Sequence, residues 1–585
     1  MRLFKPTELK QCTNQPDLVT VLYDPERRRY RLHINEYLPE LISNISSYGC
    51  TYIEIGRGQN DSVVWTSQSI YFEQDWLVPR HIQGIIVECH ELGNKSRVLQ
   101  RDAFAFIQHP LDRNDRIDEE RSRTHPNVIL LGIDAMSQVN FQRTMPLTAK
   151  FVRQPGWFEM LGYNKVGDNT LPNLLALLTG RTAKQWKYYC DVRRPGCLDA
   201  YTYIWNHYHS AGYLTAYAED LSSIDTFHYF LHGFERQPVD YYLRPFLQAI
   251  EQLMDKVEHL GYDYCVGRRQ SYRYVLDYCQ QMVQRFVKET PKPLFGLFWM
   301  NSFSHDDFSG PASVDRDFVS YLERYKTLGL FDRSIVILLS DHGQRTGPLM
   351  DLPSSFLEER LPMLHIYLPP WYRRKYPSVV RALDLNQRHL STPYDLHLTF
   401  KHLLQLLHPR LTFFEGPHCV GCQSLLHILP ENRSCEDASI PVHWCSCELY
   451  KQVSVTDRLQ DLARLVVYRI NQYLIKMNHE KQCYHLNLRK LLLAERRQFF
   501  NEKGQEVYSP NGLDSYRFKF TTKPNGGLFR ATLSSNQDAS YVIIREELIS
   551  RLNSYREDSF CVQDRTSKKF CACLKNQALS SVLEK

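Results

Sequence analysis

The chain has 585 residues, of which 43% are hydrophobic and 23% are charged, a composition typical of a folded globular protein. This length exceeds one ordinary hydrophobic core, so we expect a large catalytic domain with one or two smaller modules. The net charge of +6 is small and no dense block of lysine and arginine is interleaved with aromatic residues, which argues against nucleic acid as a partner.

The first part of the chain, residues 1–122, carries short β-like runs separated by glycine, asparagine and aspartate. Examples are Tyr52-Ile-Glu-Ile, Ser62-Val-Val-Trp and Gly84-Ile-Ile-Val. Runs of this kind, broken by turn residues, predict a small β-rich N-terminal module.

The middle part, residues 123–430, alternates apolar strand-like runs with helical patterns. The run NVILLGI from Asn127 is almost entirely apolar, which is typical of a strand buried on both faces. Further strands are predicted at 213–218, 294–300, 334–339 and 361–368, and helices at 171–178, 198–209, 271–288, 315–328 and 392–406. This alternation predicts an α/β fold: a doubly wound, mostly parallel sheet with helices on both faces.

The last part, residues 431–585, begins with the cysteine-rich patch ENRSCEDASIPVHWCSC. An amphipathic helix is predicted at 457–475, and strand-like runs such as SYRFKF and SYVIIREE follow. The turn Pro524-Asn-Gly-Gly527 predicts a hairpin. We therefore expect a Cys-rich α+β region at the C-terminal end.

Sixteen cysteines are many for a cytosolic enzyme, and zinc clusters and disulfides compete as interpretations. Several occur in close sets: Cys190/Cys197, Cys265/Cys279, Cys419/Cys422, Cys435/Cys445/Cys447 and Cys561/Cys571/Cys573. The CxxC at 419–422 has zinc-like spacing, but no second CxxC follows it, and the two CxC motifs leave little room for a tetrahedral site. Disulfides are favoured, which indicates the extracellular space or the lumen of the secretory pathway.

Four Asn-x-Ser triplets agree with that location: Asn44-Ile-Ser, Asn60-Asp-Ser, Asn94-Lys-Ser and Asn432-Arg-Ser. The start MRLFKPTELKQC lacks the apolar core of a signal peptide, and no span of about 18 apolar residues occurs. Either the chain is a piece lacking its leader, or the cysteines are reduced and the triplets are accidental. We expect the first, with no membrane span in the chain as given.

Polar groups lie just past the carboxyl ends of three of the predicted strands. Asp134 follows NVILLGI, His305 lies in WMNSFSHDD, and Asp341-His342 follows RSIVILLS. In an open α/β sheet, ligands bind outside the carboxyl ends of the strands, so these side chains are expected to meet there. Two carboxylates and an imidazole form a mixed oxygen–nitrogen site for one divalent ion, with zinc or manganese as the expected metals.

Thr170 lies at the start of a predicted helix in the stretch KVGDNTLPNLLALLTG, and two interpretations of it are open. Its hydroxyl can cap the free backbone N–H groups of the helix, which is the common role of threonine there. Alternatively it is a nucleophile, and a nearby metal would give it alkoxide character. Both roles fit one geometry, because a helix N-terminus also attracts phosphate.

Several motifs of the chain resemble those of the alkaline-phosphatase/sulfatase superfamily. The resemblance rests on GIDAMSQVNFQRTMP, VGDNTLPNLLALLTG, NSFSHDD, LLSDHGQRTG, LPMLHIYLP and LSTPYDLHLTF. The whole chain further resembles an uncharacterised animal family of extracellular sulfatase-like proteins known only as a domain of unknown function. The resemblance implies that Asp134, Thr170, Asp341 and His342 hold the main metal. It also implies that Thr170 is the nucleophile. From its place at the same strand ends, His305 is expected to bind the ester oxygen, to protonate the leaving group or to ligate a second metal.

The departures from the superfamily pattern narrow the expected chemistry. Sulfatases use a matured cysteine or serine where this chain has Thr170-Leu-Pro-Asn-Leu. Two-metal relatives have an aspartate where this chain has Asn301, so Asn301 and Asp306 remain only possible contacts for a second metal or for substrate. His389 and His397 are candidates for a further histidine ligand by position alone. The pattern resembles the single-metal branch with lipoteichoic-acid synthases and phosphoethanolamine transferases, and a second metal is doubtful.

Three functions follow as hypotheses. The first is a metal-dependent hydrolase or transferase of phosphate esters with a threonine nucleophile. The second is a sulfatase-like hydrolase of glycan sulfate esters, and the third is a catalytically silent extracellular binding or scaffold protein. The expected partner in the first two is a phosphorylated or sulfated small molecule, lipid or glycan. The grouped site residues favour activity over the scaffold.

Overall fold

The protein is described from a computed structural model. It describes residues 8–38, 47–108, 124–182, 185, 191, 194–229, 231–289, 292–413, 419–501, 503–507, 509, 511–555 and 558–574. None of the described helices is both long enough and apolar enough to cross a membrane.

The chain forms two compact units. The first comprises 1–163, 169–343 and 361–433, and the second comprises 164–168, 344–360 and 434–585. The N-terminal strands belong to the same unit as the central sheet. The division of the chain at residues 122 and 430 stays a prediction, although the second unit takes up the chain again at Ser434.

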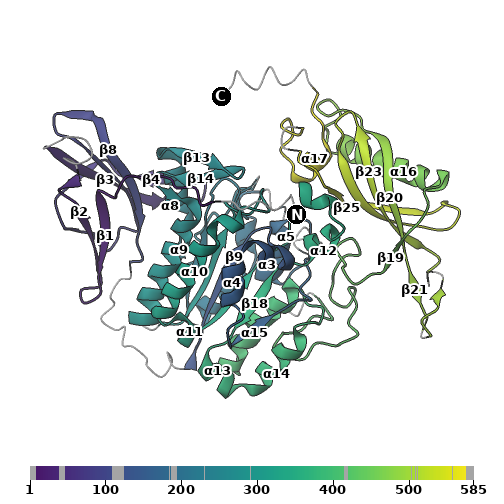
Figure 1. Ribbon diagram of the computed structural model, residues 1–585, viewed down its shortest axis with the longest axis horizontal. Coiled ribbons are helices and arrows are strands. Elements are labelled where there is room, and N and C mark those ends of the chain that lie inside the picture. Colours follow the sequence, from purple (N-terminus) through teal and green to yellow (C-terminus); the bar gives the residue numbers. More distant parts are fainter. Residues whose placement is uncertain are drawn as a thin grey trace. The chain divides into compact units, whose positions relative to one another are not determined.

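The first unit is built around a seven-stranded sheet with the order β10-β18-β17-β9-β16-β11-β12. Two of its strands, β9 and β18, are labelled in Figure 1. Its strands are β9 (Asn127–Ile133), β10 (Trp157–Glu159), β11 (Leu214–Glu219), β12 (Tyr241–Tyr242), β16 (Leu294–Met300), β17 (Ser334–Leu339) and β18 (Leu364–Tyr367). The pairs from β17 through β9, β16 and β11 to β12 are parallel. β18 pairs antiparallel with both β17 and β10. The predicted mostly parallel sheet is therefore confirmed, with antiparallel pairing confined to one side.

The core of this unit lies on both faces of the sheet, because every residue of β9, β16 and β17 is buried. Alternate side chains of a strand point to opposite faces. Ile129 and Leu131 join one hydrophobic cluster and Val128 and Leu130 join the other. Gly132 is required here, since a Cβ atom would meet the Trp299 ring at 1.9 Å.

Helices cover both faces of the sheet, as predicted for a doubly wound fold. In one hydrophobic cluster, the side chains from helices belong to α3 (Gln138–Thr144), α4 (Pro146–Phe151), α8 (Arg244–Leu253), α9 (Ser271–Met282) and α10 (Pro311–Thr327). The other takes them from α5 (Thr170–Thr179), α7 (Ile204–Ser210), α14 (Pro377–Asn386) and α15 (Pro393–Leu407).

Two predicted helices differ from the observed ones in detail. The helix predicted at 198–209 is a 3₁₀ turn, Leu198–Ala200, followed by α7. The break arises because the Asn206 side chain accepts the Tyr203 backbone N–H at 2.8 Å and so starts a new helix. The helix predicted at 271–288 consists of α9 and a π-helical stretch, Val283–Glu289.

The predicted N-terminal β-rich part is confirmed as two antiparallel arrangements with a core of their own. One is the sheet of β1 (Val19–Asp24), β2 (Arg29–Ile34) and β6 (Trp76–Leu77). The other contains β3 (Tyr48–Arg57), β4 (Val64–Thr66), β5 (Ile70–Phe72), β7 (Gly84–Glu91) and β8 (Asn94–Ala105). A small sheet of β13 (Lys256–His259), β14 (Tyr262–Val266) and β15 (Arg269–Gln270) lies between α8 and α9 in the chain.

The second unit contains a sheet with the order β19-β20-β23-β24-β25 and the helix α16 (Asp457–Lys476). The strands are β19 (Tyr450–Gln452), β20 (Asn487–Arg497), β23 (Asp514–Lys523), β24 (Leu528–Ser535) and β25 (Val542–Arg551). The predicted hairpin joins β23 to β24 in antiparallel register. The apolar side of α16 packs with the sheet in a third hydrophobic cluster, so the predicted α+β region is confirmed.

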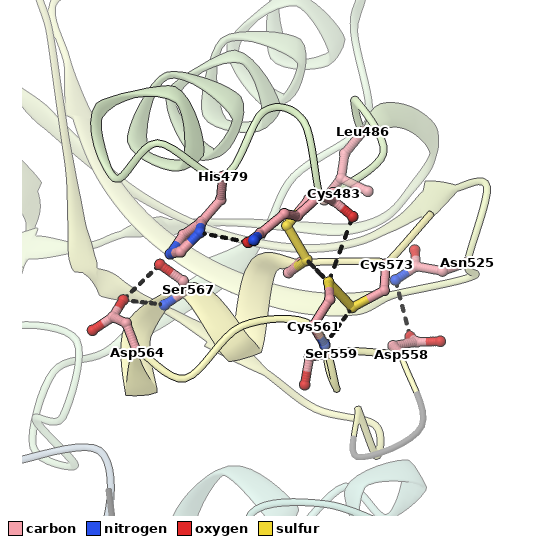
Figure 2. Close-up of a disulfide and its surroundings, with 12 residues drawn as sticks. His479, Cys483, Leu486, Asn525, Asp558, Ser559, Cys561, Asp564, Ser567 and Cys573 are labelled. Carbon is pink, nitrogen blue, oxygen red and sulfur yellow. Dashed lines mark hydrogen bonds between the residues drawn. A yellow bond between two sulfur atoms is a disulfide. The ribbon is translucent and has the colours of Figure 1, made fainter. Parts of the chain in front are cut away.

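Thirteen of the described cysteines are disulfide-bonded, so the disulfide interpretation is confirmed for them. The described pairs are Cys12–Cys265, Cys50–Cys89, Cys419–Cys422, Cys435–Cys445, Cys483–Cys571 and Cys561–Cys573, and Cys197 is disulfide-bonded as well. Cys190 lies outside the described residues. Cys279 is a buried free thiol and Cys447 an exposed one. Figure 2 shows two neighbouring disulfides of the second unit, where the Cys561 and Cys571 sulfurs lie 3.6 Å apart.

The side chains of the Asn-x-Ser triplets differ in exposure. Asn94 and Asn432 are exposed, and Asn60 is half-buried with its Oδ1 atom accepting the Ser62 backbone N–H. Asn44 lies outside the described residues. The exposed sites satisfy the steric requirement for glycosylation, which stays a prediction.

Candidate metal centre

Two strand ends bring together the three residues that best fit a metal ion. Asp134 follows β9, and Asp341 and His342 follow β17, the parallel neighbour of β9. One ligand atom from each lies within 4.8 Å of the others, and all three side chains are buried. His342 Nε2 lies 3.2 Å from Asp341 Oδ2 and 3.8 Å from Asp134 Oδ1.

The turn after β9 holds this cluster together through the backbone. Ala135 adopts a left-handed conformation with φ of 56°, which costs energy for a residue with a Cβ atom and is common at functional sites. The turn directs the Ala135 N–H at Asp341 Oδ1 (3.2 Å) and the Met136 N–H at Ser340 Oγ (2.9 Å). The ends of β9 and β17 are thereby tied to each other.

The electrostatics of the cluster keep Asp341 ionised. Burial raises the pKa of the Asp341 carboxyl, but the positive charge of His342 and a hydrogen bond from Thr170 outweigh it, so its pKa lies below the ordinary value. The other ring nitrogen of His342, Nδ1, lies 2.8 Å from the Gly343 carbonyl oxygen. A hydrogen bond from Nδ1 to this carbonyl leaves Nε2 as the ligand atom on the Asp341 side.

Thr170 is the first residue of α5, and the N-cap position is occupied by Asn169. The Thr170 hydroxyl oxygen lies 3.5 Å from Asp134 Oδ1, and the residue is 9% exposed. Its hydroxyl is thus directed at the carboxylate cluster. The Asn173 side chain bonds to the Asn169 carbonyl oxygen at 2.9 Å and supports the start of the helix.

His305 faces the same cluster from the segment that follows β16. Its Nε2 atom lies 3.8 Å from Asp134 Oδ2. Its Nδ1 atom lies 2.7 Å from Asp306 Oδ1 and 3.1 Å from the Tyr262 hydroxyl at the start of β14. Asp306 therefore contacts the outer side of the histidine ring, where a carboxylate favours a proton on Nδ1.

Asn301 is buried, and its side chain is engaged by strand neighbours. Its amide nitrogen donates to Glu219 Oε1 (3.0 Å) and Asp220 Oδ1 (3.2 Å), and its amide oxygen accepts the Trp299 indole N–H (3.2 Å). Burial, together with the charge of Asp225, raises the pKa of Glu219 to about 8. A second-metal role for Asn301 would need these bonds to be exchanged.

The two further histidine candidates belong to other surroundings. His397 Nδ1 lies 3.0 Å from the Leu177 carbonyl oxygen, near the C-terminal end of α5. At 1.5 Å of rise per residue, Leu177 is about 10 Å along the helix from Thr170. His389 is half-buried beyond the end of α14, and no described contact joins it to the cluster of Asp134, Asp341 and His342.

Three features of the site escape analysis of the sequence: the backbone turn at Ala135, the ring partner Tyr262, and the buried acid Glu219 at the end of β11. Asp220, the next residue, is visible in the sequence as a strand-end acid that could line the pocket, but such acids are common and the predicted site leaves it out. The acids do follow an apolar run, which is a signal of the same kind as Asp134 offers. No signal in the sequence points to Tyr262, because its contact with His305 depends on how the β13–β14 hairpin folds.

The donor set and its spacing fit a divalent cation. Ligand atoms bound at about 2.1 Å to a common zinc ion lie roughly 3 to 4 Å apart. The distances of 3.2 and 3.8 Å around His342 Nε2 agree with that spacing. Two carboxylates, an imidazole and a hydroxyl are ligands that zinc and manganese accept.

The chain is similar to one protein family and to several solved structures. Residues 5–492 match the family described as "Protein of unknown function (DUF229)". A comparison with curated proteins gives no match. Among solved structures, the chain is similar to PsFucS1 sulfatase from Pseudoalteromonas sp., at 13% identity and a TM-score of 0.38 over 60% of this chain and 84% of that chain.

Two further solved structures are of related kinds. One is the lipoteichoic acid synthase LtaP from Listeria monocytogenes, at 12% identity and a TM-score of 0.36, over 67% of this chain and 88% of that chain. The other is a protein in the alkaline phosphatase superfamily from Vibrio parahaemolyticus, at 12% identity and a TM-score of 0.33, over 72% of this chain and 82% of that chain. Because the family match spans most of the chain, the protein belongs to the family described as "Protein of unknown function (DUF229)".

Proposed function

We propose that the protein is a metal-dependent hydrolase or transferase that acts on phosphate esters through Thr170. One observation carries the proposal: the Thr170 hydroxyl lies 3.5 Å from Asp134, whose carboxylate shares a cluster with Asp341 and His342. A threonine placed there also stands at the N-terminus of a ten-residue helix, where backbone N–H groups and the helix dipole attract an anionic substrate.

Asp134, Asp341 and His342 would hold the metal, together with the Thr170 oxygen. A divalent cation supplies two effects when bound: it lowers the pKa of a hydroxyl and neutralises charge on a phosphate oxygen. The three protein ligands carry two negative charges when His342 is neutral, which leaves the site near neutrality and open to an anionic ester.

The residues of the chain account for the bonds made and broken. The Thr170 hydroxyl loses its proton to solvent and its oxygen forms a bond to phosphorus, while the bond from phosphorus to the leaving oxygen breaks. His305 Nε2 donates a proton to that oxygen. The oxygen of water or of an acceptor alcohol then forms a bond to phosphorus while the bond from phosphorus to the Thr170 oxygen breaks, and His305 takes the proton of the attacking group. The attacking group decides between hydrolysis and transfer.

The substrate class proposed is a phosphorylated small molecule, lipid or glycan, with a sulfated one as the alternative. Phosphate is favoured because Thr170 occupies the position where sulfatases carry a matured cysteine or serine. The six described disulfides support a place in the extracellular space or the secretory lumen, where such bonds persist.

The proposal is tested on protein purified without chelators. Its bound metal is measured, and an aryl phosphate, a phosphodiester and an aryl sulfate are compared as substrates at several metal concentrations. Acid quenching during turnover followed by peptide mass spectrometry should find phosphate on Thr170. Absence of metal and of turnover with all three esters would leave the scaffold hypothesis. A Thr170→Ala variant cannot be phosphorylated at this position. If it still turned over an ester, Thr170 would not be the nucleophile.

A further inference from the structure

We infer that Asp220 is a positioning residue for His305, although the two side chains belong to segments after different strands. The inference rests on the proposed function, in which His305 exchanges a proton with the leaving and attacking groups. It adds a residue that does not contact the metal cluster, and it explains how a histidine on a loop is held in one place.

Asp220 follows β11, and β11 runs parallel to β16 with Glu219 opposite Trp299. The Asp220 carboxylate is therefore beside the first residues after β16. Its Oδ1 atom accepts the Asn301 backbone N–H at 2.7 Å, and its Oδ2 atom accepts the Ser302 backbone N–H at 3.0 Å. Two successive N–H groups held by one carboxylate fix the direction in which the chain leaves the strand.

The turn that starts there ends at His305. The Asn301 carbonyl oxygen accepts the Ser304 N–H at 3.1 Å and the His305 N–H at 3.0 Å. Asp220 thus fixes the first peptide groups of a closed turn, and His305 is its last residue. The turn places His305 Nε2 at 3.8 Å from Asp134 Oδ2.

The buried position of Asp220 makes this role costly to replace. The side chain is 0% exposed, and burial raises the pKa of its carboxyl above the ordinary value, against the hydrogen bonds from Ser302 and Asn301 that lower it. An asparagine has one acceptor and one donor group in the same volume. Its NH₂ would face a backbone N–H, so one of the two backbone bonds would be lost.

The same unit contains a matched control, Asp315, which is also a buried carboxylate that accepts two successive backbone N–H groups. Its Oδ2 atom accepts the Leu147 N–H at 2.8 Å, and its Oδ1 atom accepts the Thr148 N–H at 2.9 Å. It is 4% exposed and holds the start of α4. Asp315→Asn therefore reproduces the loss of stability without touching the turn of His305.

The experiment compares Asp220→Asn, Asp315→Asn, His305→Ala and the double variant Asp220→Asn/His305→Ala. Asp220→Asn should lower kcat on the order of tenfold to a hundredfold, the effect of misplacing a catalytic group by about 1 Å, with bound metal unchanged. Asp315→Asn should leave kcat within about twofold of wild type. In the His305→Ala background, Asp220→Asn should have no further effect on kcat, because both act through one group.

A second measurement does not need activity. Hydrogen exchange followed by mass spectrometry should show faster exchange in peptides covering 301–305 for Asp220→Asn, and in peptides covering 147–148 for Asp315→Asn. Wild-type protein without metal or turnover would refute the proposed function, and the exchange result would still report on the turn. Unchanged exchange at 301–305, or effects of Asp220→Asn and His305→Ala that multiply, would overturn the positioning role.

Discussion

The Thr170 hydroxyl oxygen lies 3.5 Å from Asp134 Oδ1, across a sequence separation of 36 residues. This contact joins the end of β9 to the start of α5, two elements that sit at the same edge of the central sheet. A threonine at a helix start commonly serves the helix alone. Here the Thr170 hydroxyl is directed instead at the buried acids, which favours a nucleophilic role for Thr170 over a helix-capping role.

Removal of the Thr170 hydroxyl should abolish turnover and spare the fold. We expect Thr170→Ala to lower kcat by about a thousandfold or more, and Thr170→Ser to keep activity within roughly tenfold, because serine supplies the same oxygen. Thr179→Ala is the control: Thr179 is buried at the other end of α5 and bonds to the Leu175 carbonyl oxygen. Steady-state kinetics with the best ester check the prediction. Equal losses for the Thr170→Ala and Thr179→Ala variants would point to a disturbed helix instead.

Metal should stabilise the protein through Asp341. Metal that binds only the folded state adds about 2.7 kcal/mol to the free energy of unfolding at a concentration of 100 times Kd. Thermal melts of chelator-treated protein should therefore shift upward on addition of zinc or manganese. Asp341→Asn should abolish the shift, and Asp332→Asn, an exposed aspartate of α11 (Leu330–Arg333), should preserve it. A shift that survives in Asp341→Asn would place the metal elsewhere.

Hydrophobic patterning alone was sufficient to predict the sheet and the strand ends that carry the site. β16 is an apolar run and β17 is apolar after its first residue, Ser334, and the bounds of both strands agree with the prediction. Because parallel strands end at one edge, Asp134 and Asp341 could be placed together without knowledge of the strand order. Their roles as ligands, and that of Thr170, stay predictions.

Other parts of the site depend on information that a single sequence does not carry. The role inferred for Asp220 depends on strand order and register, since the pairing of β11 with β16 places it beside Asn301. An acid after a strand is common, so its type alone could not single it out. The contact between Tyr262 and His305 likewise requires the hairpin of β13 and β14 to fold back on the loop.

His365 should make the protein acid-sensitive. It lies in β18, is 3% exposed, and neither ring nitrogen has a hydrogen-bond partner among the described residues. Burial, with a small effect of Arg153, lowers the pKa of His365 to about 3. Below about pH 6.5 the unfolded chain binds a proton that the folded protein does not, so the free energy of unfolding falls as pH falls, until about pH 3.

Replacement by an apolar residue should remove this dependence. Relative to pH 7.5, wild type should lose about 2 kcal/mol at pH 5 through His365, and His365→Leu should not. Urea denaturation at both pH values measures the difference, and His485→Leu, at an exposed position, is the control. An equal loss in wild type and His365→Leu would show that His365 is protonated in the folded protein.

The two neighbouring disulfides of the second unit should differ in their contribution to stability. Cys483–Cys571 spans a sequence separation of 88 residues, and Cys561–Cys573 spans 12. In the chain-entropy account the longer loop constrains the unfolded state more, by about 4.6 kcal/mol against about 2.8 kcal/mol. Both cysteines of a pair must be replaced together, because the sulfurs of the two bonds lie as close as 3.6 Å and a single thiol would attack the other disulfide.

We therefore expect Cys483→Ala/Cys571→Ala to destabilise the second unit more than Cys561→Ala/Cys573→Ala. Hydrogen exchange of peptides from β23 and β24, measured in increasing urea, reports on this unit separately from the first. Cys483 and Cys571 are both buried in the core of the unit, whereas in the other pair Cys573 is buried and Cys561 only partly buried, so the packing loss is also larger for the Cys483–Cys571 pair. A larger effect of the Cys561–Cys573 pair would mean that local geometry outweighs loop length here.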